Sequence, residues 1–160
     1  MNLRVVCVGN IKEKFFADAI NEYLKRISRF HKIEIIETKE GNKNKTVDEI
    51  KVIECEEIKK YLKGYIISLD LKGEQITSVV FSEKIDKIAQ NNSTITFVIG
   101  GSNGLDKEIL NMSNYILSFS KMTFPHQLFR VMLLEQIYRA STISNRSEEH
   151  TSELQSRPHI

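Results

Sequence analysis

Apolar positions along the chain follow two different spacings. Five short runs are almost continuously apolar and end at glycine or polar residues, which is the pattern of buried strands. Between them, apolar residues recur every three or four positions among charged ones, as in helices with one core face. The predicted strands cover residues 3–8, 33–36, 65–71, 94–100 and 114–119, and the predicted helices cover residues 12–29, 46–62, 77–90, 106–112 and 125–143.

The order of these elements decides the fold class. Strands and helices alternate from end to end, which predicts an α/β fold with three layers around a parallel sheet. At 160 residues the chain is long enough for one domain with a sizeable core. Its 41% hydrophobic and 28% charged residues lie near the soluble globular average, which argues against a disordered, collagen-like or coiled-coil chain.

The last predicted helix has little room for a polar face. Its apolar residues are Leu128, Phe129, Val131, Met132, Leu133, Leu134, Ile137 and Tyr138. A terminal helix that is apolar nearly all round must be covered on both sides, and in a small chain a second subunit is the simplest cover. We therefore expect a homodimer; burial of the helix in the core of its own subunit is the alternative.

A glycine loop, GGSNG at residues 100–104, follows the most apolar predicted strand and precedes a helix. Ligands of open α/β sheets bind beyond the carboxyl ends of the strands, and glycines there let a ligand approach free backbone N–H groups. A purely structural turn explains two adjacent glycines equally well. The loop fits neither the P-loop pattern nor the dinucleotide fingerprint, which argues against a nicotinamide-dependent oxidoreductase and leaves an adenosine ligand open.

The second candidate segment is SFSKMTFPHQLFRVMLLEQIYRA, residues 118–140. Pro125 at the first turn of a helix costs no hydrogen bond, because its missing N–H would be unpaired there anyway. The cations of the segment are Lys121, His126, Arg130 and Arg139, and apolar surface suited to a purine ring comes from Phe119, Met122 and Phe124. From spacing alone, a solvated cationic face with ordinary core aromatics is the alternative.

Three stretches of the sequence together resemble the RlmH family. They are VVCVGNIKEKFFADAINEYLKRI, VIGGSNGL and NYILSFSKMTFPHQLFRVMLLEQIYRA. The resemblance runs from Met1 to about Asn145, and its last stretch is highly specific. The family consists of SPOUT-class methyltransferases that transfer a methyl group from S-adenosylmethionine to N3 of pseudouridine 1915 in 23S rRNA on the assembled ribosome. The resemblance therefore implies an enzyme that acts as a homodimer with S-adenosylmethionine as cofactor.

The resemblance also implies a fold and a cofactor pocket. SPOUT folds thread the C-terminal part of the chain through a loop to form a trefoil knot, a rare exception among proteins. Carried over position by position, the pocket comprises Leu69 at the end of the third predicted strand, Gly100 in the glycine loop, and the knot loop. The knot-loop residues are Phe119, Ser120, Lys121, Met122, Thr123 and Phe124.

The chemistry suggests roles for the cations. S-adenosylmethionine already carries an activated methyl group, so the enzyme mainly has to align the nucleophile with it. The N3 imide must lose its proton, and the negative charge on the ring then needs cationic or N–H partners. His126 is a candidate base, with a histidine that only bonds the backbone as the alternative. Arg130 and Lys121 are candidates for the electrostatic role or for binding rRNA phosphates. Arg139 is a third candidate catalytic residue, with an ion pair to Glu135 as its alternative.

The remaining composition bears on the cellular compartment and the binding partners of the protein. Cys7 and Cys55 have neither a CxxC nor a metal-ligand spacing, which predicts free thiols, a reducing cytoplasm and no metal site. The apolar runs are shorter than the roughly eighteen residues of a membrane span, so no membrane partner is expected. A net charge of +2 is too small to hold free RNA by charge alone, which favours an assembled ribosome as platform.

The sequence departs from the family after Asn145. Family members end in a short segment closing with Pro-Tyr-His and a basic residue, whereas this chain continues RSEEHTSELQSRPHI. Residues 146–156 resemble the in-frame translation of a common sequencing-adapter oligonucleotide. We therefore expect a single domain at residues 1–145 with a truncated C-terminus, and a disordered non-native tail at residues 146–160.

Because the family's terminal Tyr and His lie near the methyl-transfer site, weak activity is expected. A non-catalytic RNA-binding or ribosome-associated module on the same scaffold is the alternative.

Overall fold

The computed structural model describes residues 1–156, with side chains to residue 146. Its strands are β1 (Asn2–Val8), β2 (Lys32–Thr38), β3 (Tyr65–Glu74), β4 (Thr94–Ile99) and β5 (Tyr115–Leu117). Its helices are α1 (Lys14–Ile27), α2 (Val47–Lys59), α3 (Ser78–Ala89), α4 (Lys107–Met112) and α5 (His126–Ser156). The alternation predicted from the sequence is confirmed for every element.

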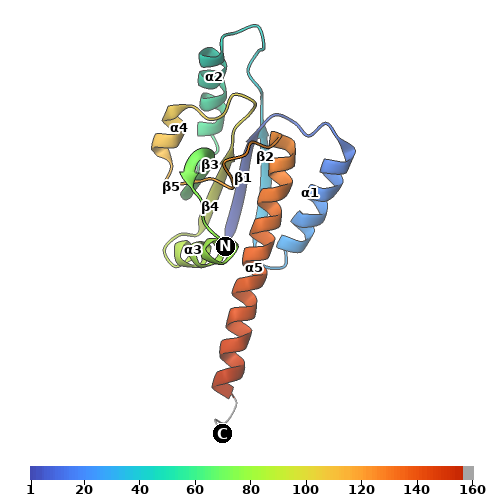
Figure 1. The fold of residues 1–160 in the computed structure, drawn as a ribbon, viewed down its shortest axis with the longest axis vertical. Helices are drawn as coiled ribbons and strands as arrows, with labels where there is room; N and C mark the ends of the chain where they lie inside the picture. The colour runs from blue at the N-terminus through green and yellow to red at the C-terminus, as the bar shows by residue number, and fades with distance from the viewer. Residues whose placement is uncertain (157–160) are drawn as a thin grey trace.

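The five strands form one sheet in the order β2-β1-β4-β3-β5, and each neighbouring pair is parallel. Helices cover both faces of the sheet, with α2 and α4 on one side and α1 and α5 on the other (Figure 1). The predicted three-layer α/β fold is therefore confirmed. Because all strands point the same way, their carboxyl ends meet at one edge, and the loops that follow them meet there too.

Both faces of the central strands are buried, which explains why the strands read as continuous apolar runs. Along β1, Leu3, Val5 and Cys7 join the larger core under α1, α3 and α5. The alternate residues Val6 and Val8 join a smaller core under α2 and α4. All six residues of β4 are buried, so this strand lies at the centre of the molecule.

The side chain of Thr46 caps the start of α2. Thr46 Oγ1 accepts a hydrogen bond from the backbone N–H of Glu49 at 3.2 Å and donates one to the Glu49 carboxylate at 3.1 Å. Thr46 thereby satisfies one backbone N–H that the helix end leaves free. Thr77 caps α3 in the same way, by accepting from the backbone N–H of Val80 at 3.1 Å.

Two elements are longer than the pattern predicts. Strand β3 continues to Glu74, across an irregular register with β5, where the sequence favours a turn. Gly73 makes this possible because a Cβ there would lie 2.6 Å from the backbone carbon of Leu117. Helix α5 continues to Ser156 rather than ending near Ile143.

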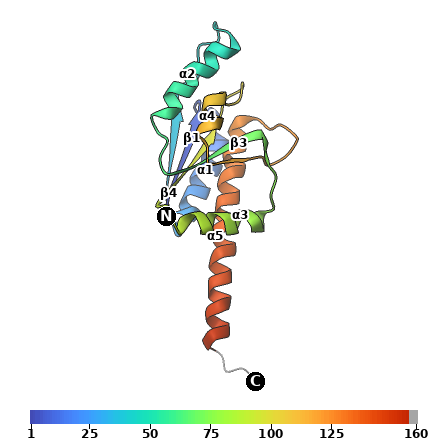
Figure 2. The same ribbon diagram turned by 90° about the vertical axis from the view of Figure 1, so that its left-hand side faces the viewer.

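The extended α5 takes in residues 146–156, which were expected to be disordered. This stretch contains neither glycine nor proline, and an established helix propagates through such residues at little cost. Residues 157–160 lie outside the described part of the chain. Helix α5 starts at the carboxyl edge of the sheet and runs past its opposite edge (Figure 2). Within the described residues, no helix combines the length and apolar character needed to cross a membrane.

Candidate functional site

A cavity of about 620 Å³ lies at the carboxyl edge of the sheet, where β3, β4 and β5 end. Its volume is in the range of small-molecule sites, roughly 300 to 1,000 Å³. Three segments that are far apart in the sequence form its walls: residues 69–72, the glycine loop 99–104 and residues 117–126. The predicted cofactor residues that line it are Leu69, Gly100, Phe119, Ser120, Met122, Thr123 and Phe124.

The glycine loop forms a tight turn on one wall of the cavity. Gly104 donates its N–H to the Gly101 carbonyl at 3.0 Å, and the two residues form an isolated antiparallel bridge. Gly104 has a φ of 78°, in the left-handed region that favours glycine. A Cβ on Gly100 would lie 2.8 Å from the backbone carbon of Gly104. The turn therefore requires its glycines for structure and also presents bare backbone to the cavity.

Residues 118–125 form the opposite wall and are held by local hydrogen bonds. Ser118 donates its N–H to the Glu74 carbonyl at 2.9 Å and its hydroxyl to the Ser120 carbonyl at 3.1 Å. The Ser120 hydroxyl accepts from the N–H of Met122 at 3.0 Å. The Phe119 ring packs against Phe129 of α5, with 4.9 Å between centroids. The wall is thus an apolar surface attached to the start of α5.

His126, the predicted base, lines the cavity as the first residue of α5. Pro125 occupies the preceding position, and its carbonyl accepts the N–H of Phe129 at 2.9 Å, which closes the first helical turn. The predicted helix start at proline is therefore confirmed within one residue. The half-buried imidazole lies where a ligand in the cavity would meet the helix.

Asp70 also lines the cavity, and the sequence reasoning missed it. Its carboxylate accepts the backbone N–H of Lys72 at 3.0 Å, and Lys72 lines the cavity as well. The sequence feature that could have identified Asp70 is its place at the carboxyl end of the third predicted strand, beside Leu69. Its apolar neighbours Leu69 and Leu71 assign it correctly to the strand but give no sign that its side chain faces a ligand site.

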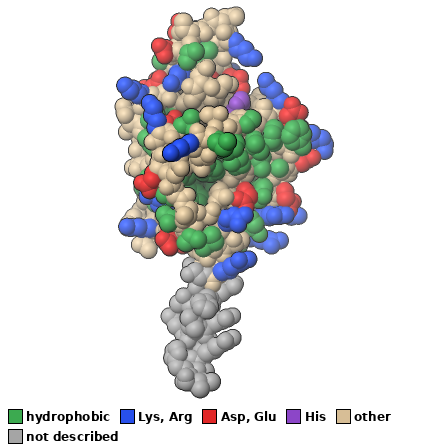
Figure 3. All heavy atoms as spheres, viewed as in Figure 1, with side chains coloured by type: hydrophobic (Ala, Val, Ile, Leu, Met, Phe, Trp, Pro, Cys, Tyr) green, Lys and Arg blue, Asp and Glu red, His purple; other side chains and the backbone are tan. Residues whose placement is uncertain are grey.

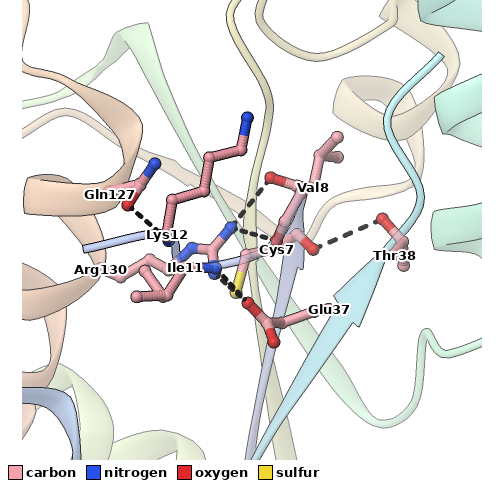
Figure 4. Close-up of polar contacts among 9 residues, drawn as sticks. Cys7, Val8, Ile11, Lys12, Glu37, Thr38, Gln127 and Arg130 are labelled. Atoms are coloured by element: carbon pink, nitrogen blue, oxygen red, sulfur yellow. Dashed lines mark hydrogen bonds and ion pairs between the residues drawn. The ribbon is translucent and has the colours of Figure 1, made fainter. Parts of the chain in front are cut away.

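Arg130 does not line the cavity, which corrects the expectation that it contacts substrate. Its side chain is only 1% exposed and forms an ion pair with Glu37 at 2.7 Å. Its second terminal nitrogen donates to the carbonyls of Val8 at 2.9 Å and Gly9 at 2.5 Å (Figure 4). The helix turns this position toward the ends of β1 and β2, so the guanidinium is already engaged inside the protein.

Arg139 and Lys121 also lie outside the cavity lining. Arg139 is exposed and forms an ion pair with Glu135 at 2.6 Å, one helical turn earlier. The alternative anticipated for Arg139, a local ion pair, is thus present. Lys121 is exposed on the loop between two cavity residues, and it has no ion pair among the described residues.

Cys55, Glu56 and Glu108 form a second polar cluster, between α2 and α4. The ammonium group of Lys59 pairs with both carboxylates and so supplies the positive charge between them. Burial, together with the Glu108 carboxylate, raises the pKa of the Cys55 thiol to about 11. Through these ion pairs, the cluster joins the two helices.

Comparison with known proteins gives matches over most of the chain. A family model described as "Predicted SPOUT methyltransferase" matches residues 1–150. A Clostridium botulinum (strain Hall) protein named ribosomal RNA large subunit methyltransferase H is 51% identical over 158 residues, which cover 94% of this chain and 99% of that protein. The protein of that name from Caldicellulosiruptor saccharolyticus is 48% identical over 145 residues, covering 88% of this chain and 94% of its own. A solved tRNA (m1G37) methyltransferase from Aquifex aeolicus is 12% identical, with a TM-score of 0.48 and coverage of 87% and 70%.

Proposed function

The chain belongs to the RlmH family of SPOUT methyltransferases, and on that premise we propose that it methylates N3 of pseudouridine 1915 in 23S rRNA. Its methyl donor would be S-adenosylmethionine, and its substrate the assembled ribosome. The observation that carries the proposal is the single cavity that joins residues from three distant segments, those after β3, β4 and β5. The trefoil knot of SPOUT folds belongs to the same proposal.

The cavity residues suit S-adenosylmethionine. Bare backbone at the glycine loop lets a ligand come close to peptide N–H groups, and a Cβ on Gly100 would deform this turn because it would collide with the backbone of Gly104. Phe119 and Phe124 offer flat apolar surface for a purine ring. Asp70 supplies a carboxylate that could bind an amino or hydroxyl group of the donor.

When bound, S-adenosylmethionine supplies a methyl group activated on a sulfonium. The protein then has to hold the target base in line with that group and remove the N3 proton. An unprotonated ring nitrogen of His126 would accept the proton, since the imidazole lies on the cavity wall. The Asp70 carboxylate is the second candidate base. Lys72 on the cavity lining and Lys121 on the adjoining loop are the cations that would stabilise negative charge on the ring or bind rRNA phosphates.

A homodimer in the cytoplasm is part of the proposal. Leu128, Val131 and Met132 on the outward side of α5 are only half-buried within a single chain, and Phe15 on α1 is 64% exposed. Hydrophobic side chains gather across the face that α5 and α1 share (Figure 3). Exposed apolar patches of this kind favour association, and a second copy would cover the helix that the sequence singled out.

The test is a methyl-transfer assay on ribosomes isolated from cells that lack this modification. With isotope-labelled S-adenosylmethionine, we expect label in methylated pseudouridine after nucleoside digestion and mass spectrometry, and little transfer to free rRNA. His126→Ala should lower the transfer rate by roughly a hundredfold or more if the imidazole is the base. Cofactor binding without transfer by the wild-type chain would favour the non-catalytic RNA-binding alternative. Absence of cofactor binding would overturn the proposal.

A further inference from the structure

We propose that the buried Arg130 and the partly exposed Glu37 form a latch that positions the start of α5 and, through it, the 118–125 wall of the cavity. Arg130 lies one helical turn after His126 and directly after Phe129, yet its own side chain points away from the cavity. It acts as a positioning residue, because its partners are protein groups. The predicted effect on cofactor binding rests on the proposed function, whereas the positioning itself rests on contacts alone.

The latch joins α5 to the carboxyl ends of two strands. One terminal nitrogen of Arg130 pairs with the Glu37 carboxylate of β2 at 2.7 Å, and the other donates to two carbonyls at the end of β1 (Figure 4). A guanidinium presents its donors in a rigid planar fork. Three simultaneous contacts therefore fix both the position and the rotation of the first turns of α5.

Two further contacts tie the loop between β1 and α1 to β2 and to α5. The Glu37 carboxylate that binds Arg130 also accepts the N–H of Ile11 at 2.9 Å. Gln127, next to His126, accepts the N–H of Lys12 through its side-chain oxygen at 3.2 Å. The loop is thus bound to β2 on one side and to α5 on the other.

The position of the first turn of α5 also determines the position of the cavity wall. Phe129 precedes Arg130 and stacks on Phe119, with 4.9 Å between the ring centroids. Both rings line the cavity, as does His126. If the first turn of α5 shifts, the ring contact and the candidate base must move together.

The energetics of the pair also favour a positioning role. Burying the Arg130 guanidinium is costly, although the Glu37 side chain stays 36% exposed, and an apolar pair of similar volume is often as stable as an ion pair withdrawn from water. Arg130 Nε is buried and has no hydrogen-bond partner among the described residues, which adds to the cost. Stability alone therefore gives little reason for an arginine here, whereas a fixed geometry does.

The matched experiment compares two double variants. E37M/R130M replaces the latch by apolar side chains. R4M/E34M removes another Arg–Glu pair between β1 and β2, in which Arg4 contacts Glu34 at 2.8 Å and the Tyr61 carbonyl at 2.9 Å, away from the cavity. The measurements are the urea midpoint, the amide exchange of Ser118 and Phe129, and S-adenosylmethionine affinity by calorimetry. We expect E37M/R130M to keep its midpoint near that of the control, to exchange both amides at least tenfold faster, and to bind at least tenfold more weakly than R4M/E34M.

Wild-type exchange and wild-type affinity in E37M/R130M would overturn the latch. If that variant does not fold, R130K decides the matter, because lysine keeps the buried charge but lacks the fork. R130K should fold, exchange the Phe129 amide faster and bind S-adenosylmethionine at least fivefold more weakly; unchanged values would overturn the proposal. If the wild-type chain does not bind S-adenosylmethionine at all, the proposed function fails, and the amide exchange alone then tests the latch.

Discussion

Burial controls the protonation of several side chains that do not line the cavity. Cys7 is fully buried on β1, and desolvation raises the pKa of its thiol to about 12, although the Arg130 charge opposes the rise. Burial and the Glu108 carboxylate together raise the pKa of the Cys55 thiol to about 11. The thiolate is the reactive form of cysteine, so both thiols should be chemically inert in the folded protein.

The first prediction concerns these thiols. At pH 8, a disulfide reagent that releases a coloured thiolate should react at least about a hundredfold more slowly with the native protein than with the urea-unfolded chain. The lower thiolate fraction and the lack of access act in the same direction. Absorbance during the reaction measures the rate and the number of thiols. Rapid labelling of one thiol without urea would show that its surroundings open readily.

His31 predicts a dependence of stability on pH. Burial lowers the pKa of its imidazole, as does the N-terminal amino group, while Asp86 opposes them. The folded state therefore binds protons less readily than the unfolded chain, in which histidine titrates near 6.5. As pH falls through about 6.5, the unfolded chain takes up the proton first, and the free energy of unfolding decreases.

The matched variant for this prediction is His31→Gln, which cannot titrate. Urea unfolding at pH 7.5 and pH 5.5 should show the stability of the wild type falling more steeply than that of the variant. Other groups titrate in both proteins, so the difference between them isolates His31. Parallel loss of stability in the two proteins would contradict the assignment.

At the scale of elements, the contribution of the glycine loop to ligand binding can be tested separately from its contribution to stability. A Cβ on Gly100 would lie 2.8 Å from the backbone of Gly104 and would deform the turn on the cavity wall. Gly100→Ala should therefore weaken S-adenosylmethionine binding by tenfold or more, with a loss of about 1 to 2 kcal/mol in the free energy of unfolding. Calorimetry and urea unfolding measure the two effects.

Gly64→Ala is the control for that variant. Gly64 has a φ of 69°, and a side chain there would clash with the Thr94 carbonyl, far from the cavity lining. It should destabilise the protein but leave the affinity of the folded fraction unchanged. Equal loss of affinity in both variants would mean that the glycine loop matters only through global stability.

The same elements show what the sequence can and cannot predict. Each strand and helix has its own apolar spacing, and Thr46 and Pro125 mark helix starts, so the order and rough bounds could be derived locally. The extension of β3 to Glu74 depends on its pairing with Leu117, which no local pattern contains. The length of α5 was missed because a charged stretch without a core face still continues an existing helix.

The candidate site, too, could be predicted only in part from the sequence. Leu69, Gly100 and residues 119–124 could be assigned from the family resemblance, and the structure brings seven of these eight residues to one cavity. Arg130 could not be assigned correctly, since its ion-pair partner Glu37 lies 93 positions earlier in the chain. Whether a cation faces a ligand or a strand end depends on the rotation of its helix, which is fixed by tertiary packing.

At the scale of the whole molecule, α5 has two roles that use different faces. Leu133, Leu134 and Ile137 are fully buried and complete the core under α1 and α3. Leu128, Val131 and Met132 lie on other sides of the same helix and remain half-buried. Both interpretations of the apolar helix therefore have support, because one face fills the subunit's own core and the other remains available to a second subunit.

The last prediction tests that available face. Sedimentation equilibrium should give a mass of twice 18.5 kDa for the wild-type chain. Leu128→Asp places a charge on the outward face, where burying it in an interface would be costly, so this variant should sediment as a monomer or associate at least a hundredfold more weakly. Val52→Asp is the control, since Val52 is 54% exposed on α2 in the opposite layer and should leave the mass unchanged. A wild-type chain that remains monomeric at high concentration would remove the second subunit from the proposal. An unchanged mass for Leu128→Asp would instead move the interface to a different surface.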